Sequence, residues 1–348
     1  MFTESSTNSH FSVKPTYYSP PGALALLDSY QRSITYLRLS VTDLCNLRCR
    51  YCMPPGGIEL QQRSEILSWE EMLRLVNIFV ALGIRKLRIT GGEPFVRKGL
   101  PDFLRLVRKS FKLGLYITTN GVDVARFVPE LKAINISGIN LSLDTLNRQR
   151  FIEIARRDAF EQVLETLNAI LQSGIPLKIN SVVKQGFNTD DILQIARLAQ
   201  HNPVEIRFIE EMPFAGSAGV GPSSWNAERI TALLRSHYPA MQALAQGNAT
   251  ARLFRIPGYV GRVGVIASYS RQFCGDCNRV RITANGYLKT CLYDAGALDL
   301  KMLLRSGASD QEIQTRIRQC VAGRFRDGFE AFANRRTKIT ESMASIGG

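Results

Sequence analysis

The chain has no hydrophobic run that approaches the roughly eighteen residues of a membrane-spanning helix. Residues 1–22, MFTESSTNSHFSVKPTYYSPPG, lack both the basic and the apolar segment of a secretory signal, and they carry an early acidic residue that is unusual in a transit peptide. These absences argue against the secreted and membrane-embedded classes. We therefore expect a cytoplasmic protein in which residues 1–30 form a flexible leader.

Histidine is also scarce, with three in the chain, so a histidine-based metal site is not favoured. Cysteine is better supplied, and in a chain without an export signal it predicts reduced thiols and metal ligation rather than disulfides. Six of the seven cysteines form two groups of three, at Cys45, Cys49 and Cys52 and at Cys274, Cys277 and Cys291. Cys320 lies in a helical apolar pattern, where we expect it to act as a small buried hydrophobe.

Acidic residues are outnumbered, 30 against 44 lysines and arginines, which gives a formal net charge of +14. Such a balance predicts attraction to a polyanion, whether nucleic acid, a membrane surface or a phosphorylated small molecule. The hydrophobic share of 45% and the charged share of 21% are ordinary for a globular protein. Charge alone does not choose among these partners.

Short apolar segments alternate with helical patterns along the first part of the chain, which is typical of βα units and a parallel sheet. The predicted strands cover residues 36–41, 85–90, 114–119, 138–143, 177–183 and 204–210. They indicate an α/β fold, a partial (β/α)6 TIM-type barrel over 31–213, followed by a C-terminal region over 214–348 that carries the second cysteine group.

Helix signals lie between and after these strands. S-W-E-E from Ser68 is a capping box followed by apolar residues at helical spacing. Residues 214–251 are rich in Gly, Ser and Ala and predict a connector with one helix at 227–234. Residues 310–332 have a helical pattern, and the end from residue 335 is expected to be extended or flexible.

Polar motifs follow four of the predicted strands: GGEP (91–94), TNG (119–121), SLD (142–144) and EEMP (210–213). In barrels of this kind the ligand lies at the carboxyl ends of the strands, so these motifs are candidate binding loops. The alternative is that Gly, Asn and Asp simply make turns there.

Basic residues alternate with apolar ones inside the strands, at Arg38, Arg88, Lys178 and Arg207. Side chains alternate between the two faces of a strand, so the basic residues share one face. An edge or solvent-facing position would also explain them, although this is less common in parallel strands covered by helices. If they converge on a barrel lumen, they form a pocket for a phosphate chain.

Three cysteines without a fourth leave one coordination position of a metal centre open. The first group suits a four-iron four-sulfur cluster with one free iron, and a zinc ion with three thiolates and water is the alternative. For the second group, a zinc site completed by Asp276 or Cys320 and an iron–sulfur cluster are comparably consistent with the spacing.

The first cysteine group, with Tyr51 before its last member and GGEP after the next strand, resembles the radical S-adenosylmethionine (SAM) superfamily. CGDCNRVR (274–281), the third cysteine thirteen residues on, and Gly347–Gly348 add a closer likeness. From about Ile34 to its last residue, the chain resembles the MoaA-type GTP 3′,8-cyclase family of molybdenum cofactor biosynthesis.

This resemblance implies two four-iron four-sulfur clusters, one on each cysteine group, with SAM on the free iron of the first and the guanine of GTP on that of the second. It implies SAM contacts from Tyr51, Gly92, Glu93, Asn120, Ser142 and Met212. It implies GTP contacts from Arg38, Arg88, Thr119, Lys178, Arg207, Arg279 and Arg281, with Thr118 as an alternative to Thr119. Arg279, Arg281, Gly347 and Gly348 are expected to act in catalysis, the two glycines by reaching into the active site.

The reaction implied by the resemblance begins when an electron from the first cluster cleaves SAM to a 5′-deoxyadenosyl radical. That radical removes the C3′ hydrogen of GTP, C3′ attacks guanine C8, and reduction of the resulting aminyl radical gives 3′,8-cyclo-7,8-dihydro-GTP. The expected partners are GTP, an external electron donor and a downstream cyclic pyranopterin monophosphate synthase, with a possible homodimer and with neither nucleic acid nor a membrane.

Two other interpretations compete with this one. A different radical SAM enzyme with an auxiliary cluster, of the peptide maturase type, would keep the first cysteine group but does not need lumen arginines. A basic nucleic-acid-binding protein with a zinc module would explain the charge and the C-x2-C spacing, but not GGEP or the first cysteine group.

Overall fold

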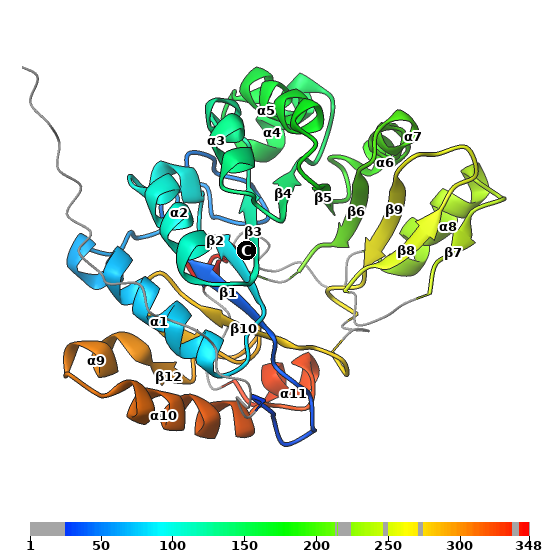
Figure 1. The fold of residues 1–348 in the computed structure, drawn as a ribbon. Helices are drawn as coiled ribbons and strands as arrows, with labels where there is room; N and C mark the ends of the chain where they lie inside the picture. The colour runs from blue at the N-terminus through cyan, green and yellow to red at the C-terminus, as the bar shows by residue number, and fades with distance from the viewer. Residues whose placement is uncertain are drawn as a thin grey trace, which may run out of the picture.

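The structure is a computed structural model that describes residues 25–212, 214, 224–245, 250–270, 274–335 and 341–347. Within these ranges the chain forms one curved sheet with helices on its outer side (Figure 1). The strand order in the described part of the chain is β12-β11-β10-β1-β2-β3-β4-β5-β6-β9-β8-β7.

The six predicted strands form the centre of the sheet, parallel and in sequence order. Each matches its prediction to within a residue at either end. The curved sheet with outer helices confirms the predicted partial barrel. The strands are β1 (Tyr36–Ser40), β2 (Lys86–Thr90), β3 (Gly114–Thr119), β4 (Gly138–Ser142), β5 (Leu177–Val183) and β6 (Glu205–Glu210).

The C-terminal region extends this sheet at both edges. β10 (Arg279–Ile282) pairs in parallel with β1, and β9 (Arg262–Ile266) pairs in parallel with β6. Unpaired edge strands leave backbone groups without partners, and the added strands satisfy them. The outermost strands are antiparallel: β11 (Tyr287–Lys289) and β12 (Leu298–Asp299) beyond β10, and β8 (Arg252–Arg255) and β7 (Gln242–Ala243) beyond β9.

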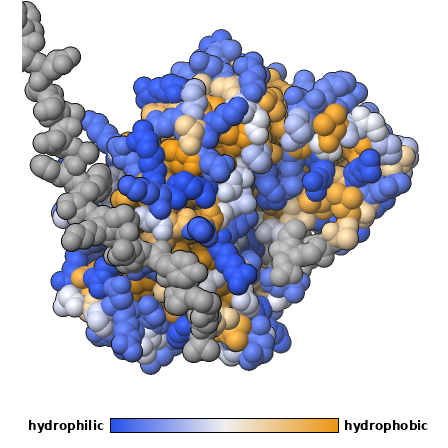
Figure 2. All heavy atoms as spheres, viewed as in Figure 1, coloured by the Kyte–Doolittle hydropathy of each residue, from blue (hydrophilic) through white to orange (hydrophobic). Residues whose placement is uncertain are grey.

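Most of the helices cover the convex side and bury the apolar face of the strands (Figure 1). On the view in Figure 2, hydrophilic residues cover most of the outer helical surface. No helix in the described ranges combines the length and the apolar character needed to cross a membrane. The helices are α1 (Trp69–Ala81), α2 (Leu100–Ser110), α3 (Val128–Ala133), α4 (Arg148–Ala155), α5 (Phe160–Ser173), α6 (Ile192–Ala196), α7 (Leu198–His201), α8 (Ala227–His237), α9 (Leu300–Arg305), α10 (Asp310–Ala322), α11 (Gly328–Ala333) and α12 (Met343–Ile346).

Both ends of the described chain are more ordered than the sequence suggests. Residues 1–24 of the expected leader lie outside the described residues, but Leu26 and Asp28 are buried. The helical pattern at 310–332 divides into α10 and α11 after Gly323. The expectation of an extended end is wrong for residues 341–347, because α12 packs Ile346 against an apolar cluster that the local sequence does not reveal.

The capping box that begins α1 is present as predicted. The Ser68 hydroxyl accepts a hydrogen bond from the Glu71 amide at 3.1 Å, and the Glu71 carboxylate accepts one from the Ser68 amide at 2.7 Å. These bonds satisfy two amide groups that have no partner within the helix.

We expect Ser68→Ala to lower the free energy of unfolding by about 1 kcal/mol, because the amide of Glu71 loses its partner. Urea denaturation followed by circular dichroism measures the change. Ala in place of the exposed Ser64 is the matched control and is expected to have a smaller effect. Equal stability of the Ser68 variant and the unsubstituted protein would contradict the prediction.

Candidate active site

The GGEP loop after β2 holds the chain that leads into the first cysteine group. The amides of Gly92 and Glu93 donate to the carbonyls of Thr42 and Leu44, each at 2.8 Å. A Cβ added to Gly92 would lie 2.3 Å from the Leu44 carbonyl oxygen. Glycine is therefore required here by the close approach of two backbones, directly before Cys45.

Glu93 lies at the centre of this arrangement and is fully buried. Its carboxylate accepts hydrogen bonds from the amides of Asn120 (2.7 Å) and Phe95 (3.1 Å) and from the Thr119 hydroxyl (2.9 Å). Burial raises the pKa of Glu93 to about 7, although these bonds act in the opposite direction. Glu93 thus joins the GGEP loop to the TNG loop after β3.

The TNG and SLD loops also contact the cysteine segment. The Asn120 side chain donates to Asn46 at 2.7 Å and lies 3.7 Å from the Cys45 sulfur. The Tyr51 hydroxyl donates to Asp144 at 2.8 Å, and burial raises the pKa of that carboxyl to about 6. The predicted SAM residue Ser142 ends β4 on the concave face, and Asp144 is a further contact that sequence reasoning noted as part of SLD but did not assign to the site.

The three thiols of the first group lie close enough together that each acts on the charge of another. Burial raises the pKa of Cys45 to about 12 and that of Cys52 to about 11, and it raises the pKa of Cys49 well above its usual range. Buried thiolates need a nearby positive charge, which a metal centre supplies. The group is therefore suited to hold a cluster.

The second cysteine group lines one pocket. Cys274, Cys277 and Cys291 face it together with Arg279 and Arg324. Burial acts to raise the pKa of Cys277, but the guanidinium groups of Arg279 and Arg324 outweigh it and lower that pKa to about 6. Arg324 donates to the Cys277 sulfur at 2.9 Å. One thiol of this group is thus stabilised as the anion that ligates metal.

No three Cys, His, Asp or Glu side chains in the described ranges are arranged around a single metal ion. A four-iron cluster is larger than one ion, so its thiolate ligands stand farther apart. The absence of a single-ion site in these ranges therefore does not bear on a four-iron cluster.

The predicted basic residues meet on the concave face of the sheet. Arg38 in β1 is opposite Arg88 in β2 and Arg281 in β10, so three arginines from neighbouring strands lie side by side. The hydrophilic residues around the central hollow in Figure 2 are consistent with a polar lumen. The interpretation of these residues as edge or solvent-facing charges does not fit their place on central strands.

The lumen has members that sequence reasoning missed. The ammonium group of Lys86 lies 4.5 Å from the ring centre of Tyr36 and 4.4 Å from that of Tyr116. Glu205 accepts from Lys178 at 3.0 Å and from Arg207 at 2.5 Å, so it joins these two predicted cations. Three of these residues, Tyr36, Lys86 and Glu205, lie in β1, β2 and β6. The alternation along those strands already placed them on the same face as the predicted basic residues.

The crowding of positive charge in the lumen lowers the pKa of two of its arginines. Burial and the neighbouring Arg279 lower the pKa of Arg281 to about 10, and burial with Arg281 and Arg88 lowers the pKa of Arg38 well below its usual range. A cation that is buried among cations gains when an anion enters. The lumen is thus prepared for a polyanionic ligand.

Thr118 and Thr119 point to opposite faces of β3. The Arg88 guanidinium donates to the Thr118 hydroxyl at 3.3 Å, on the lumen side. Thr119 is buried on the other side and bonds Glu93 and the Gly121 amide. The predicted GTP contact of Thr119 remains a prediction, and the geometry favours Thr118 for it.

The segment 341–347 ends on the concave face, where Gly347 lies against Ser40 and Thr90 at the carboxyl ends of β1 and β2. The Gly347 carbonyl accepts a hydrogen bond from Arg281 at 2.7 Å. Gly347 has φ of +83°, and an added Cβ would lie 2.7 Å from the Thr90 hydroxyl, so this place also requires glycine. Gly348 lies outside the described residues.

Met212, expected beside SAM, lines the pocket of the second cysteine group.

Family models match most of the chain. The model described as the radical SAM superfamily matches residues 39–199, and the model described as molybdenum cofactor synthesis C matches 204–329. The fold agrees with the radical SAM model. The crystal structure of Streptococcus suis SuiB bound to S-adenosylmethionine is similar to this chain with a TM-score of 0.57 at 14% sequence identity, and the alignment covers 82% of this chain and 65% of that one. The fold and the first cysteine site are therefore those of a radical SAM enzyme, a class that uses a four-iron four-sulfur cluster and SAM.

Curated relatives define the family more closely. The chain is 42% identical over 291 residues to GTP 3′,8-cyclase 2 of Pseudomonas aeruginosa, covering 82% of this chain and 88% of that protein. It is 40% identical over 305 residues to molybdenum cofactor biosynthesis protein 1 of Homo sapiens, of which it spans about half the length (85% of this chain, 47% of that protein). The chain belongs to the family of radical SAM proteins that contains the GTP 3′,8-cyclases and molybdenum cofactor biosynthesis protein 1.

We expect Gly92→Ala to reduce the iron bound after anaerobic reconstitution, because the new methyl group must push the Leu44 carbonyl away and displace Cys45. Iron content and the visible absorbance of the cluster measure the effect. Gly56→Ala, where an added methyl meets open space on the far side of Cys52, is the control and should load normally. Normal loading of the Gly92 variant would contradict the prediction.

Proposed function

We propose that the protein is a GTP 3′,8-cyclase that forms 3′,8-cyclo-7,8-dihydro-GTP in molybdenum cofactor biosynthesis. The observation that supports this most is the cationic lumen, whose Arg279 and Arg281 also line the pocket of the second cysteine group. A triphosphate carries the several negative charges that such a set of cations binds, whereas the peptide substrate of a maturase does not need them. Relatives at 41–42% identity that are named GTP 3′,8-cyclases support the same substrate.

The first cysteine group would hold the cluster, and the loops after β2, β3 and β4 would bind SAM. When bound, these two groups supply the radical chemistry that removes the C3′ hydrogen of GTP. The chain's own contribution is to bind and orient the reactants. Glu93 is held by three donors, so it can receive the SAM amino group without moving. The proposed SAM contacts are Tyr51, Gly92, Glu93, Asn120, Ser142 and Met212.

We propose a second cluster on Cys274, Cys277 and Cys291, with an open position for guanine. The depressed pKa of Cys277 and the shared pocket support it. Arg279 and Arg281 alternate with Val280 in β10, so both lie on the concave face between this pocket and the lumen. They could therefore hold GTP while its guanine reaches the second site.

The remaining lumen cations would hold the triphosphate. Anchoring by several guanidinium and ammonium groups fixes the ribose relative to the SAM site, and such positioning is a large part of catalysis. Glu205 would keep Lys178 and Arg207 extended toward the ligand. The proposed set is Arg38, Arg88, Thr118 or Thr119, Lys178, Arg207, Arg279 and Arg281, with Lys86 added from the structure.

The proposal includes an external electron donor and a downstream synthase that converts the product to cyclic pyranopterin monophosphate. It also includes a cytoplasmic location and a possible homodimer.

An anaerobic assay of reconstituted protein with SAM, dithionite and GTP tests the function. We expect about eight iron atoms per chain, the sum of two four-iron clusters, and 5′-deoxyadenosine formation that depends on GTP. Mass spectrometry should also detect the cyclised nucleotide. About four iron atoms per chain, with deoxyadenosine formation unaffected by GTP, would agree with a radical SAM enzyme but contradict the proposal that GTP is its substrate.

We expect GTP affinity to fall by roughly 3- to 10-fold between pH 7 and pH 9. Burial and the positive charges of Arg88 and Lys178 lower the pKa of Lys86 to about 8, so this ammonium loses its charge as the pH rises through that value. Equilibrium binding in the absence of reductant measures the dissociation constant.

In the Lys86→Met variant this pH dependence should be weaker. Tyr36 could produce a similar pH dependence, so Tyr36→Phe is the control. Burial acts to raise the pKa of Tyr36, but Arg88 and Arg38 outweigh it and lower that pKa to about 7. The phenolate formed above this pH would repel GTP and also weaken binding as the pH rises. An unchanged pH profile in the Lys86 variant would remove Lys86 from the phosphate site.

A further inference from the structure

We propose that Glu341 is a positioning residue. Together with Lys289 and Arg335 it locks the segment 341–347 in place, so that Gly347 stays beside Arg281. The inference rests on the proposed function where it concerns turnover, but the lock itself is a property of the structure.

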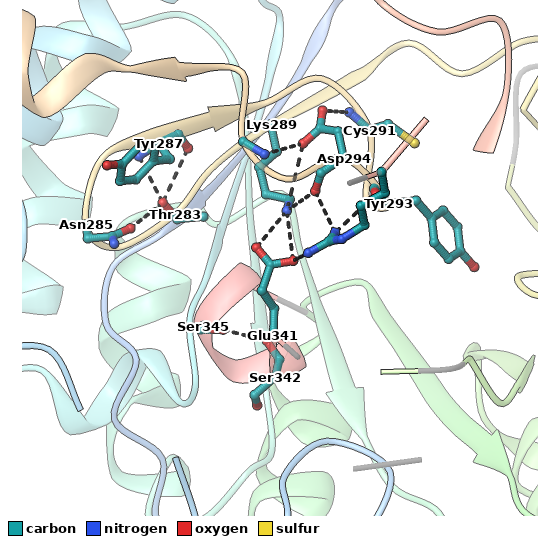
Figure 3. Close-up of polar contacts among 12 residues, drawn as sticks. Thr283, Asn285, Tyr287, Lys289, Cys291, Tyr293, Asp294, Glu341, Ser342 and Ser345 are labelled. Carbon is teal, nitrogen blue, oxygen red and sulfur yellow. Dashed lines mark hydrogen bonds and ion pairs between the residues drawn. The ribbon is translucent and has the colours of Figure 1, made fainter. Parts of the chain in front are cut away.

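The first observation is the environment of Lys289, whose side chain is 1% exposed at the end of β11. Its ammonium group lies 3.1 Å and 3.3 Å from the two carboxylate oxygens of Glu341 and also donates to the Asp294 carbonyl (Figure 3). A buried ammonium group is costly unless it is paired. Glu341, brought from a distant part of the chain, is the nearer of its two carboxylate partners, because the Asp294 carboxylate lies 3.8 Å away.

Arg335 completes the lock from the other side of the carboxylate. It donates to Glu341 at 2.7 Å, and its other terminal nitrogen donates to the carbonyls of Tyr293 (3.2 Å) and Asp294 (3.1 Å). Its side chain is 5% exposed. Two nearly buried cations therefore hold one carboxylate against the loop that follows β11.

That loop carries a ligand of the second cysteine group. The Asp294 carboxylate accepts from the amides of Thr290 (2.7 Å) and Cys291 (2.8 Å) and from the Thr290 hydroxyl (2.9 Å) (Figure 3). These bonds fix the backbone at Cys291. Through Lys289 and Arg335, which both also donate to the Asp294 carbonyl, Glu341 is thus attached to the same rigid turn that presents this thiol.

The next residue is attached to the other cysteine group. The Ser342 hydroxyl donates to the Cys52 carbonyl at 2.7 Å and also accepts from the Ala344 amide at 3.1 Å, which begins α12. Two consecutive residues therefore contact the loops of both proposed cluster sites. The start of α12 is thus fixed both by Lys289, close to Cys291, and by the Cys52 carbonyl.

The two ends of the segment are held by neighbouring strands. Lys289 in β11 is the cross-strand partner of Arg281 in β10. Lys289 binds Glu341 at the start of the segment, and Arg281 binds the Gly347 carbonyl at its end. Releasing Glu341 would leave a four-residue helix held at one end, and so short a helix has little stability of its own.

Glu341→Gln in the reconstituted full-length protein tests the lock. The variant keeps the size of the side chain and removes its charge. Hydrogen exchange of peptides that cover 341–347 reports on the amides of Ile346 and Gly347, which bond the carbonyls of Ser342 and Met343. We expect protection of this segment to fall about tenfold or more, the scale expected when a buried ion pair loses one member. Bound iron and protection elsewhere should be unchanged.

Three further variants sharpen the test. Glu341→Asp retains the charge and should keep most of the protection, and Lys289→Met combined with Glu341→Gln should be no worse than Glu341→Gln alone, because the two residues act as one unit. Glu65→Gln, which removes an exposed pair with Lys301, is the matched control and should leave segment 341–347 protected.

Unchanged protection in Glu341→Gln, or an equal loss of protection over the whole chain, would overturn the lock. Turnover of GTP is measured separately and should fall about tenfold or more with the loss of protection. If the unsubstituted protein does not turn over GTP, the proposed function fails, while the exchange result still decides whether the lock exists.

Discussion

The concentration of positive charge inside the curve of the sheet is the constraint on which the rest of the structure depends. Arg38, Arg88 and Arg281 lie side by side on neighbouring strands, and burial with repulsion from neighbouring arginines lowers the pKa of Arg38 and Arg281. The concave face therefore cannot close into a hydrophobic barrel core, because burying these charges without an anion is costly. It has to stay open to an anion, and the loops at the strand ends are therefore free to hold cofactors.

The two cysteine groups use different means to prepare their thiols. The first group is partly buried, and burial raises the pKa of its thiols, so a bound metal centre would have to drive their deprotonation. In the second group, two arginines already favour the thiolate of Cys277. The backbone around the first group is set by the close contact of Gly92 with Leu44, and that around the third thiol of the second group by the carboxylate of Asp294.

Much of this could be read from the sequence, because local patterns carry it. The alternation of Leu37, Arg38 and Leu39 predicted both the strand and the face on which the charge lies, and S-W-E-E predicted the start of α1. The same alternation would have favoured Thr118 over Thr119 for the lumen face. Contacts between distant residues could not be read in this way. The bond from Ser342 to Cys52 joins positions 290 apart, and nothing near either residue indicates it.

The pairing of β10 with β1 has a consequence for the order in which the protein forms. The Asn278 side chain bonds that of Thr35, 243 residues earlier, directly beside this pair of strands. Strands β1 to β6 can pair with their neighbours as they leave the ribosome, but the outer edge of β1 has to wait for nearly the whole chain. The first cysteine group thus belongs to the early part of folding, and the second can be assembled only at its end.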